Sequence, residues 1–132
     1  MNFRTLSVVS GILGMAFGAA STLAQPFMAS LYGLPTEAAN IGQARAFGGL
    51  LFVWGLIAFA LRDLAERAAQ RALLAANTAG YAIQLVLTLH GIGTGTLNAV
   101  SWSSVAIYLA LAAATLLVMR RTAPVHAVHA GR

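Results

Sequence analysis

Four long apolar runs dominate the chain, and they cover residues 5–25, 43–61, 72–90 and 99–119. Each run has roughly the 20 residues that an α-helix needs to cross the hydrocarbon core of a bilayer. Charged residues or Gly, Pro and Asn separate the runs, as is typical between helices. The runs lack the period-2 alternation of membrane β-barrels. The pattern predicts an all-α integral membrane four-helix bundle over residues 1–121, followed by a disordered cytoplasmic tail at 122–132.

The composition also indicates a chain that is surrounded by lipid. Hydrophobic residues make up 59% of the 132 residues and charged residues only 8%, whereas a soluble domain carries about a quarter charged residues. The net charge of +5 could indicate nucleic acid, but no basic cluster is interleaved with aromatic residues, so we expect no nucleic acid partner. The cations are arginines and alanine is abundant, which favours a GC-rich bacterial genome. The expected partner is the lipid bilayer.

The arginines predict the orientation, because short cytoplasmic loops retain Arg and Lys. Three places on one side of a four-span topology carry them: Arg4; Arg62, Arg67 and Arg71; Arg120, Arg121 and Arg132. Both termini are therefore expected in the cytoplasm, in a multi-pass protein of the bacterial inner membrane. Arg45 alone falls on the other side.

The first run has a second interpretation as a cleaved signal peptide. Arg4 would form its charged start, residues 6–20 its apolar region, and Thr22 and Ala24 of "STLAQ" the cleavage site. Cleavage would leave three spans. Against it, small and polar residues share one face of this helix and allow close helix packing in lipid. They are Ser7, Gly11, Gly14, Gly18, Ser21 and Gln25, and Gly48 and Gly49 in the second run are expected to serve the same packing.

Polar residues recur at helical spacing in the last two runs. One stripe comprises Asn77, Tyr81, Gln84 and Thr88, and the other Ser101, Ser104, Tyr108 and Thr115. Polar groups facing acyl chains would lack hydrogen-bond partners, so both stripes should point into the bundle. They are interpreted either as hydrogen-bonding contacts between helices or as the wall of a small polar path. The first interpretation is favoured because no ionisable group accompanies them at mid-membrane depth.

The connectors predict geometry more than chemistry. Residues 62–71 pair Arg62 with Glu66 and Asp63 with Arg67 at i,i+4, which predicts a solvated helical elbow. Residues 90–99 are rich in glycine and predict a tight external turn. Residues 26–42 are semi-apolar and are expected to lie as a lid on the outer surface, with Pro26 ending the first helix and a new helix opening at Pro35.

Reactive groups are scarce. The chain has no cysteine, which excludes thiol chemistry and Cys-ligated metals. Glu37 is predicted on the opposite side of the membrane from Asp63 and Glu66, so these acids form no general acid/base pair. His126 and His129 could bind a metal weakly but fall in the tail. We expect no catalytic residues, no metal and no cofactor.

One polar ring is predicted at the external end of the spans. Arg45 should sit about one turn inside this boundary, at the level shared by Gln25, Thr88, His90, Asn98, Ser101 and Ser104. In a structural interpretation Arg45 ties helix ends together or pairs with Glu37. In a functional one it binds the anionic or carbonyl group of a lipid, quinone or small amphiphile.

Short motifs add a resemblance. They are "LYGL" at 31–34, "ARAFGG" at 44–49, "RD" at 62–63 and "GTLNAVSW" at 95–102. In this order they resemble a family of small bacterial four-helix integral membrane proteins that carries no assigned activity. The resemblance covers nearly the whole chain and implies the architecture alone.

Three functions stay open. The leading hypothesis is a non-enzymatic accessory protein that binds lipid or a small amphiphile. The alternative is a small homo-oligomeric transporter or channel that uses the two polar stripes. A third is a membrane enzyme acting on lipid or quinone through Arg45 and His90.

Overall fold

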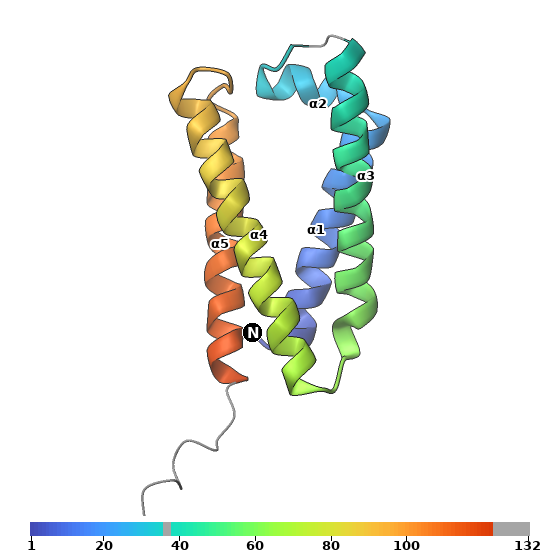
Figure 1. Ribbon diagram of the computed structural model, residues 1–132, viewed down its shortest axis with the longest axis vertical. Coiled ribbons are helices and arrows are strands. Elements are labelled where there is room, and N and C mark those ends of the chain that lie inside the picture. The colour runs from blue at the N-terminus through green and yellow to red at the C-terminus, as the bar shows by residue number, and fades with distance from the viewer. Residues whose placement is uncertain (36–37, 123–132) are drawn as a thin grey trace, which may run out of the picture.

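The computed structural model describes residues 1–35 and 38–122, with side chains described from residue 41 in the second range. Within these ranges every element of regular secondary structure is a helix. The elements, in order, are α1 Phe3–Leu23, α2 Gln25–Tyr32, α3 Ala38–Ala60, the short 3-10 helix η1 Leu61–Asp63, α4 Arg67–Gly93 and α5 Ser101–Arg121 (Figure 1). Thr36, Glu37 and the tail from residue 123, with His126 and His129, lie outside the described residues.

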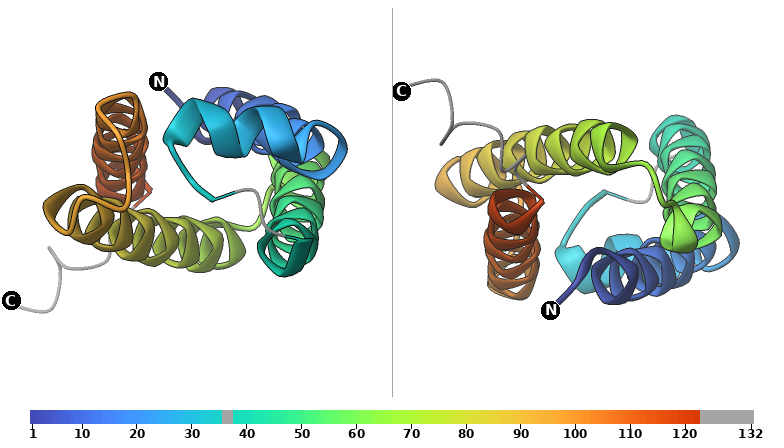
Figure 2. Two further views of the ribbon diagram at one scale, coloured as in Figure 1. Left: turned by 90° about the horizontal axis from the view of Figure 1, so that it is seen from above. Right: turned by 90° about the horizontal axis from the view of Figure 1, so that it is seen from below.

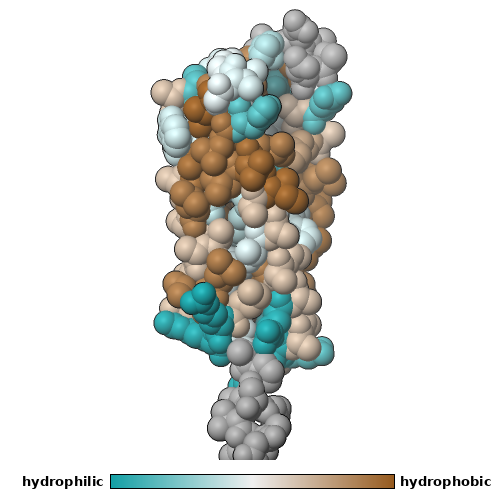
Figure 3. Space-filling view, turned by 60° about the vertical axis from the view of Figure 1, so that its left-hand side comes forward, coloured by the Kyte–Doolittle hydropathy of each residue, from teal (hydrophilic) through white to brown (hydrophobic). Residues whose placement is uncertain are grey.

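Four helical segments are long and apolar enough to cross a membrane: Phe3–Leu23, Ile41–Asp63, Arg67–Gly93 and Ser101–Arg121. This confirms the four predicted spans. The second and third segments are longer than the predicted runs, and the 27 residues of α4 reach about 40 Å at 1.5 Å per residue. The first and fourth segments have the predicted length and are shifted by two residues. Large apolar side chains stay exposed on α3, α4 and α5, among them Leu50, Val86 and Leu117. Figure 3 shows such side chains as a broad apolar belt, the surface expected of a protein solvated by lipid.

Glycines bring α1 and α3 into backbone contact. Gly11, Gly14 and Gly18 of α1 lie against α3 near Gly48 and Gly55. A Cβ atom on Gly55 would lie 2.5 Å from the backbone nitrogen of Met15, so no larger residue fits there without moving a helix. Such contacts are typical of helix pairs in lipid, where small residues permit close dispersion contacts.

Gly49 is not part of this contact, because a Cβ atom on Gly49 would meet no neighbouring atom within 4 Å. Gly55 takes its place in the contact, which the sequence analysis missed. Gly55 lies one heptad after Gly48, and helix periodicity therefore puts both on the face toward α1.

The second helix pair is α4 with α5. A tight turn at 94–100 joins them, and its Gly95 has a φ of 73°. The backbone nitrogens of Thr96 and Leu97 donate to the Gly91 oxygen over 2.9 and 3.1 Å. The predicted tight turn is thus confirmed, although α4 continues into it as far as Gly93.

Seen along their axes, the four long helices lie around a common centre as two pairs, α1 beside α3 and α4 beside α5 (Figure 2). α2 lies across the end of this arrangement at which α4 turns into α5 (Figure 1). At the opposite end a small apolar core of Phe3, Leu6, Leu74 and Val118 joins α1, α4 and α5. Both described ends of the chain lie there.

The predicted helical elbow at 62–71 is wrong. Helix α3 passes into η1 and stops, and the C-cap Leu64 and Glu66 are extended, with ψ angles of 120° and 116°. The two i,i+4 pairs are therefore absent, and Asp63 pairs with Arg4 of α1 instead, at 3.0 Å. A continuous helix would carry the chain away from the molecule, whereas the extended segment lets Leu64 pack against the apolar core.

The outer connector also differs in detail. α1 ends at Leu23, and Gln25 begins α2 with Pro26 in its first turn. Proline is favoured there because its missing N–H would have no partner anyway. Pro26 therefore opens a helix of its own. Gly33, with a φ of 74°, then ends α2 in the left-handed conformation typical of helix ends.

Candidate functional site

Both polar stripes lie on inward faces of α4 and α5. Asn77 and Thr88 are buried and Tyr81 and Gln84 half-buried; Ser101 and Thr115 are buried and Ser104 and Tyr108 half-buried. This agrees with the expectation that these groups avoid acyl chains. The seam between the two helix pairs is consequently polar along much of its length.

At mid-height the first stripe makes a hydrogen bond across this seam. The Trp54 indole nitrogen of α3 donates to the Asn77 side-chain oxygen over 2.9 Å. One turn further on, the Tyr81 side chain lies near Ser10 of α1. Asn77 therefore serves as a contact between helices. Sequence reasoning missed the role of Trp54, because nothing in its apolar surroundings signals a partner on another helix.

The α2 helix is latched onto the start of α5. The Asn98 side-chain amide donates to the Leu31 carbonyl over 2.8 Å, and its backbone nitrogen donates to the Tyr32 carbonyl over 3.2 Å. The Tyr32 hydroxyl also bonds the Ser104 hydroxyl at 3.1 Å. Asn98 of the predicted ring thus has a structural partner on both its backbone and its side chain.

Two polar groups near the α2 end of the molecule are buried and have no hydrogen-bond partner among the described residues. Gln25 is 4% exposed and Ser101 is 0% exposed, and neither Gln25 Oε1 nor Ser101 Oγ has a hydrogen bond to the described residues. An unsatisfied buried polar atom costs about 1–3 kcal/mol. Most such atoms in proteins are satisfied by protein, water or ligand, so each of these two oxygens has the capacity for a further hydrogen bond.

Arg45 and His90, the ionisable members of the predicted ring, are exposed. No hydrogen bond or ion pair of either side chain appears among the described residues. Their backbone carbonyls do accept hydrogen bonds, the Arg45 carbonyl from the Thr22 hydroxyl at 3.4 Å and the His90 carbonyl from the Thr94 hydroxyl at 3.0 Å. Arg45 precedes Trp54 by nine residues, about two and a half helical turns, and therefore points to the opposite side of α3. Since Trp54 faces α4, Arg45 faces away from it.

The predicted ring consequently falls into three parts. Gln25, Thr88 and Ser101 are each buried. Asn98 is part of the α2 latch. Arg45 and His90 lie at the surface on separate helices, so the geometry does not bring them together as one anion site.

Metal-binding chemistry finds no support in the described residues. No three His, Asp or Glu side chains gather there in a group that could hold a metal ion. The buried oxygens of Gln25 and Ser101 offer hydrogen bonding.

Comparisons with known proteins return no relative. No protein-family model, no curated protein and no solved structure matches the chain. The resemblance to the family of small four-helix membrane proteins stays a prediction, and the function has to be argued from the residues of this chain.

Proposed function

We propose that the chain is a multi-pass protein of the bacterial inner membrane, a four-span bundle with both termini in the cytoplasm, that binds a lipid or small amphiphile without transforming it. The four apolar helices support the membrane assignment. The orientation draws on Arg4, Arg62, Arg67 and Arg121, which share the end opposite α2. The positive-inside rule gives that end to the cytoplasm.

The observation that carries the binding proposal is the pair of unpartnered buried oxygens on Gln25 and Ser101. Both belong to elements at the outer end, where α2 begins and where α5 begins. The Asn98 latch holds α2 over the start of α5. A ligand headgroup beneath α2 would satisfy atoms that otherwise lower the stability of the fold.

The chemistry of these atoms limits the headgroup. An amide oxygen accepts a hydrogen bond, while a hydroxyl donates or accepts one. The headgroup therefore presents at least one hydrogen-bond donor. It is uncharged, because the buried residues Gln25, Thr88 and Ser101 are not ionisable. Its apolar tail would lie along exposed side chains of the helix pairs, where it replaces ordinary acyl chains.

Native mass spectrometry of the purified protein tests the proposal. We expect a bound small molecule in the parent protein, and at least about a threefold lower occupancy in Ser101→Ala and Gln25→Leu, since each loses a hydrogen bond worth about 1 kcal/mol. Ser103→Ala is the matched control, because Ser103 is exposed and bonds the Val100 carbonyl of its own segment. Equal occupancy in all four proteins would sink the proposal.

A second candidate is transport by a homo-oligomer along the polar stripes. Gln84 and Tyr108 favour it, since both are half-buried on inward faces and no hydrogen bond of their side chains is formed with described residues. Solute flux into liposomes would test it, with Gln84→Leu expected to abolish the flux. Flux that is absent from the parent protein would eliminate this function.

A further inference from the structure

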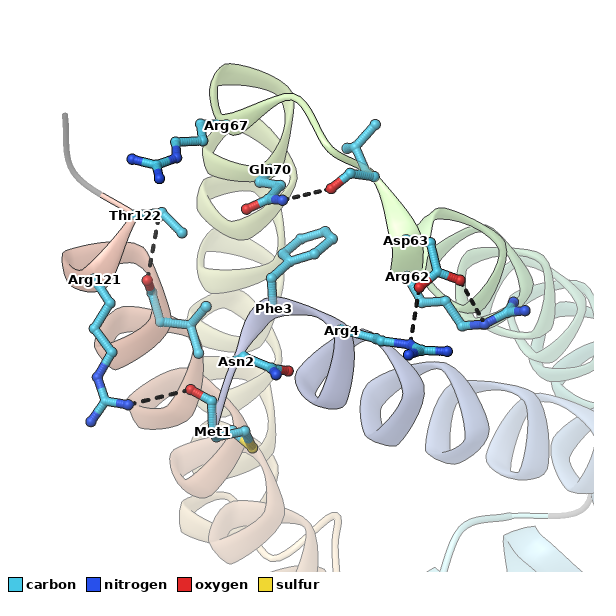
Figure 4. Close-up of a pocket in the computed structure, with 12 residues that line it drawn as sticks. Met1, Asn2, Phe3, Arg4, Arg62, Asp63, Arg67, Gln70, Arg121 and Thr122 are labelled. Carbon is cyan, nitrogen blue, oxygen red and sulfur yellow. Dashed lines mark hydrogen bonds and ion pairs between the residues drawn. The ribbon is translucent and has the colours of Figure 1, made fainter.

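A pocket of about 490 Å³ opens at the end of the molecule opposite α2. Its walls come from the start of α1, the segment between η1 and α4, the first turns of α4 and the end of α5 (Figure 4). In the sequence these segments are far apart. Gln25 and Ser101, on which the proposed function rests, do not line this pocket.

The pocket carries more positive than negative charge. Arg4, Arg62, Arg67 and Arg121 line it, and Asp63 is its one lining carboxylate. Asp63 is shared, at 3.0 Å from the Arg4 Nε and 3.5 Å from the Arg62 Nε. Among the described residues neither Arg67 nor Arg121 has an acidic partner. An anion in the pocket would meet two guanidinium groups that are free of carboxylates.

Parts of the pocket wall are held in place before any ligand arrives. Arg62 lies 4.4 Å from the centre of the Phe59 ring and donates to the Phe59 carbonyl over 3.0 Å. The Gln70 amide donates to the Leu64 carbonyl over 2.6 Å, which fixes the extended segment that sets the spacing of Arg62 and Arg67. The backbone that carries Arg67 is therefore held in place, which lowers the entropic cost of binding an anion there.

Beneath the arginines the pocket becomes apolar. Phe3 and Val118 belong both to its lining and to the apolar core at this end. Leu117 lies one turn before Arg121 on the same face of α5 and is exposed. A cationic rim above apolar side chains matches a phospholipid, whose phosphate lies at the interface and whose acyl chains lie in the hydrocarbon.

We propose that this arginine pocket binds the phosphate group of an anionic phospholipid. Arg67 and Arg121 contact the phosphate, while Arg4 and Arg62 stay bridged by Asp63 and add to the positive potential. Guanidinium groups suit this role because they present several donors to phosphate oxygens at once. The pocket would hold one lipid at a defined position between the start of α1 and the end of α5.

Binding of short-chain phosphatidylglycerol to the full-length protein in detergent, counted by native mass spectrometry, tests this site. We expect phosphatidylglycerol to bind at least about tenfold more tightly than phosphatidylcholine, and Arg67→Gln with Arg121→Gln to lose at least about tenfold of that affinity. The double variant Arg71→Gln with Arg120→Gln is the control, since it removes equal charge from residues outside the pocket. An equal loss in the control would overturn the site.

A loss of affinity can also result from misfolding, so a variant that gains affinity provides a second test. Asp63→Asn removes the competing carboxylate and is expected to tighten phosphatidylglycerol binding at least about threefold. Glu66→Gln removes one negative charge from a neighbouring residue that does not line the pocket, and should leave the affinity unchanged. If both variants bind equally, general surface charge explains the binding and the proposal fails.

A competition experiment distinguishes a lipid phosphate from a soluble phosphate compound. Inorganic phosphate and glycerol phosphate, added at constant ionic strength, should not displace the lipid at concentrations equal to that of the lipid, because they lack the acyl chains that reach Leu117 and the apolar floor. Displacement at equal concentration would assign the pocket to a soluble phosphate compound instead. A failure of the outer headgroup proposal would leave this result unaffected, since the two sites share no residue.

Discussion

The indole nitrogen of Trp54 donates a hydrogen bond to the side-chain oxygen of Asn77 over 2.9 Å, and this contact joins α3 to α4. Asn77 is buried, so its oxygen has little access to other partners. The contact lies at mid-height of the apolar helices, and in the hydrocarbon core of a bilayer little water would compete for it. It is one of few side-chain hydrogen bonds between the two helix pairs.

A double-mutant cycle measures what this contact contributes. Trp54→Phe and Asn77→Leu each remove one partner, and we expect a coupling free energy of about 0.6 kcal/mol and at most about 1.7 kcal/mol, as for other hydrogen bonds between membrane helices. Unfolding of the purified protein by sodium dodecyl sulfate gives the four stabilities required. A coupling of zero would mean that the contact exchanges with water or lipid.

The close approach of α1 and α3 makes Gly55 sensitive to substitution. Gly55→Ala should lower the free energy of unfolding by about 1–3 kcal/mol, because the new Cβ atom would meet the backbone of Met15 and force the helices apart. Gly49→Ala in the same helix is the control. Its Cβ atom meets open space, so the variant should be neutral or more stable by up to about 1 kcal/mol.

The same melting experiment checks both glycine predictions. Thermal unfolding in detergent, followed by tryptophan fluorescence, should rank Gly49→Ala at or above the parent protein and Gly55→Ala clearly below it. Equal melting temperatures for the two variants would contradict the backbone contact between α1 and α3.

The α2 latch should open when Asn98 loses its side chain. Asn98→Ala removes the bond to the Leu31 carbonyl and is expected to raise deuterium exchange across α2, while exchange in α3 and α5 stays unchanged. Tyr32→Phe removes only the bond to Ser104 and should raise exchange less. Unaltered exchange in Asn98→Ala would show that packing alone holds α2 in place.

The sequence predicted the spans well because their signal is independent of context. A run of about 20 apolar residues can satisfy its backbone polar groups in lipid only as a helix. The stripe that contains Gly11, Gly14 and Gly18 could be predicted equally well, since helical periodicity fixes which residues share a face. Its partner was harder to predict: Gly48 and Gly55 pack against α1, while Gly49 faces outward.

The elbow and the ring show where sequence reasoning fails. Asp63 and Arg67 have the spacing of a helical ion pair, but Arg4, distant in sequence, offers Asp63 a partner at 3.0 Å. The ring was inferred from depth alone, and depth says nothing about direction around the helix axis. The exposed Arg45 and the buried Ser101 share a level without sharing a face, which only the packing of α3 could reveal.

Orientation in the membrane can be tested directly because the chain contains no cysteine. Single substitutions Thr94→Cys, in the turn before α5, and Ala65→Cys, in the segment before α4, place one thiol at each end of the molecule, and both positions are exposed. A thiol reagent that cannot cross the inner membrane should label Thr94→Cys in intact spheroplasts and should label Ala65→Cys only after lysis. We expect this result because the arginines gather at the Ala65 end, and the positive-inside rule assigns such an end to the cytoplasm. Labelling of Ala65→Cys alone would invert the topology, and it would move the arginine pocket to the outer leaflet.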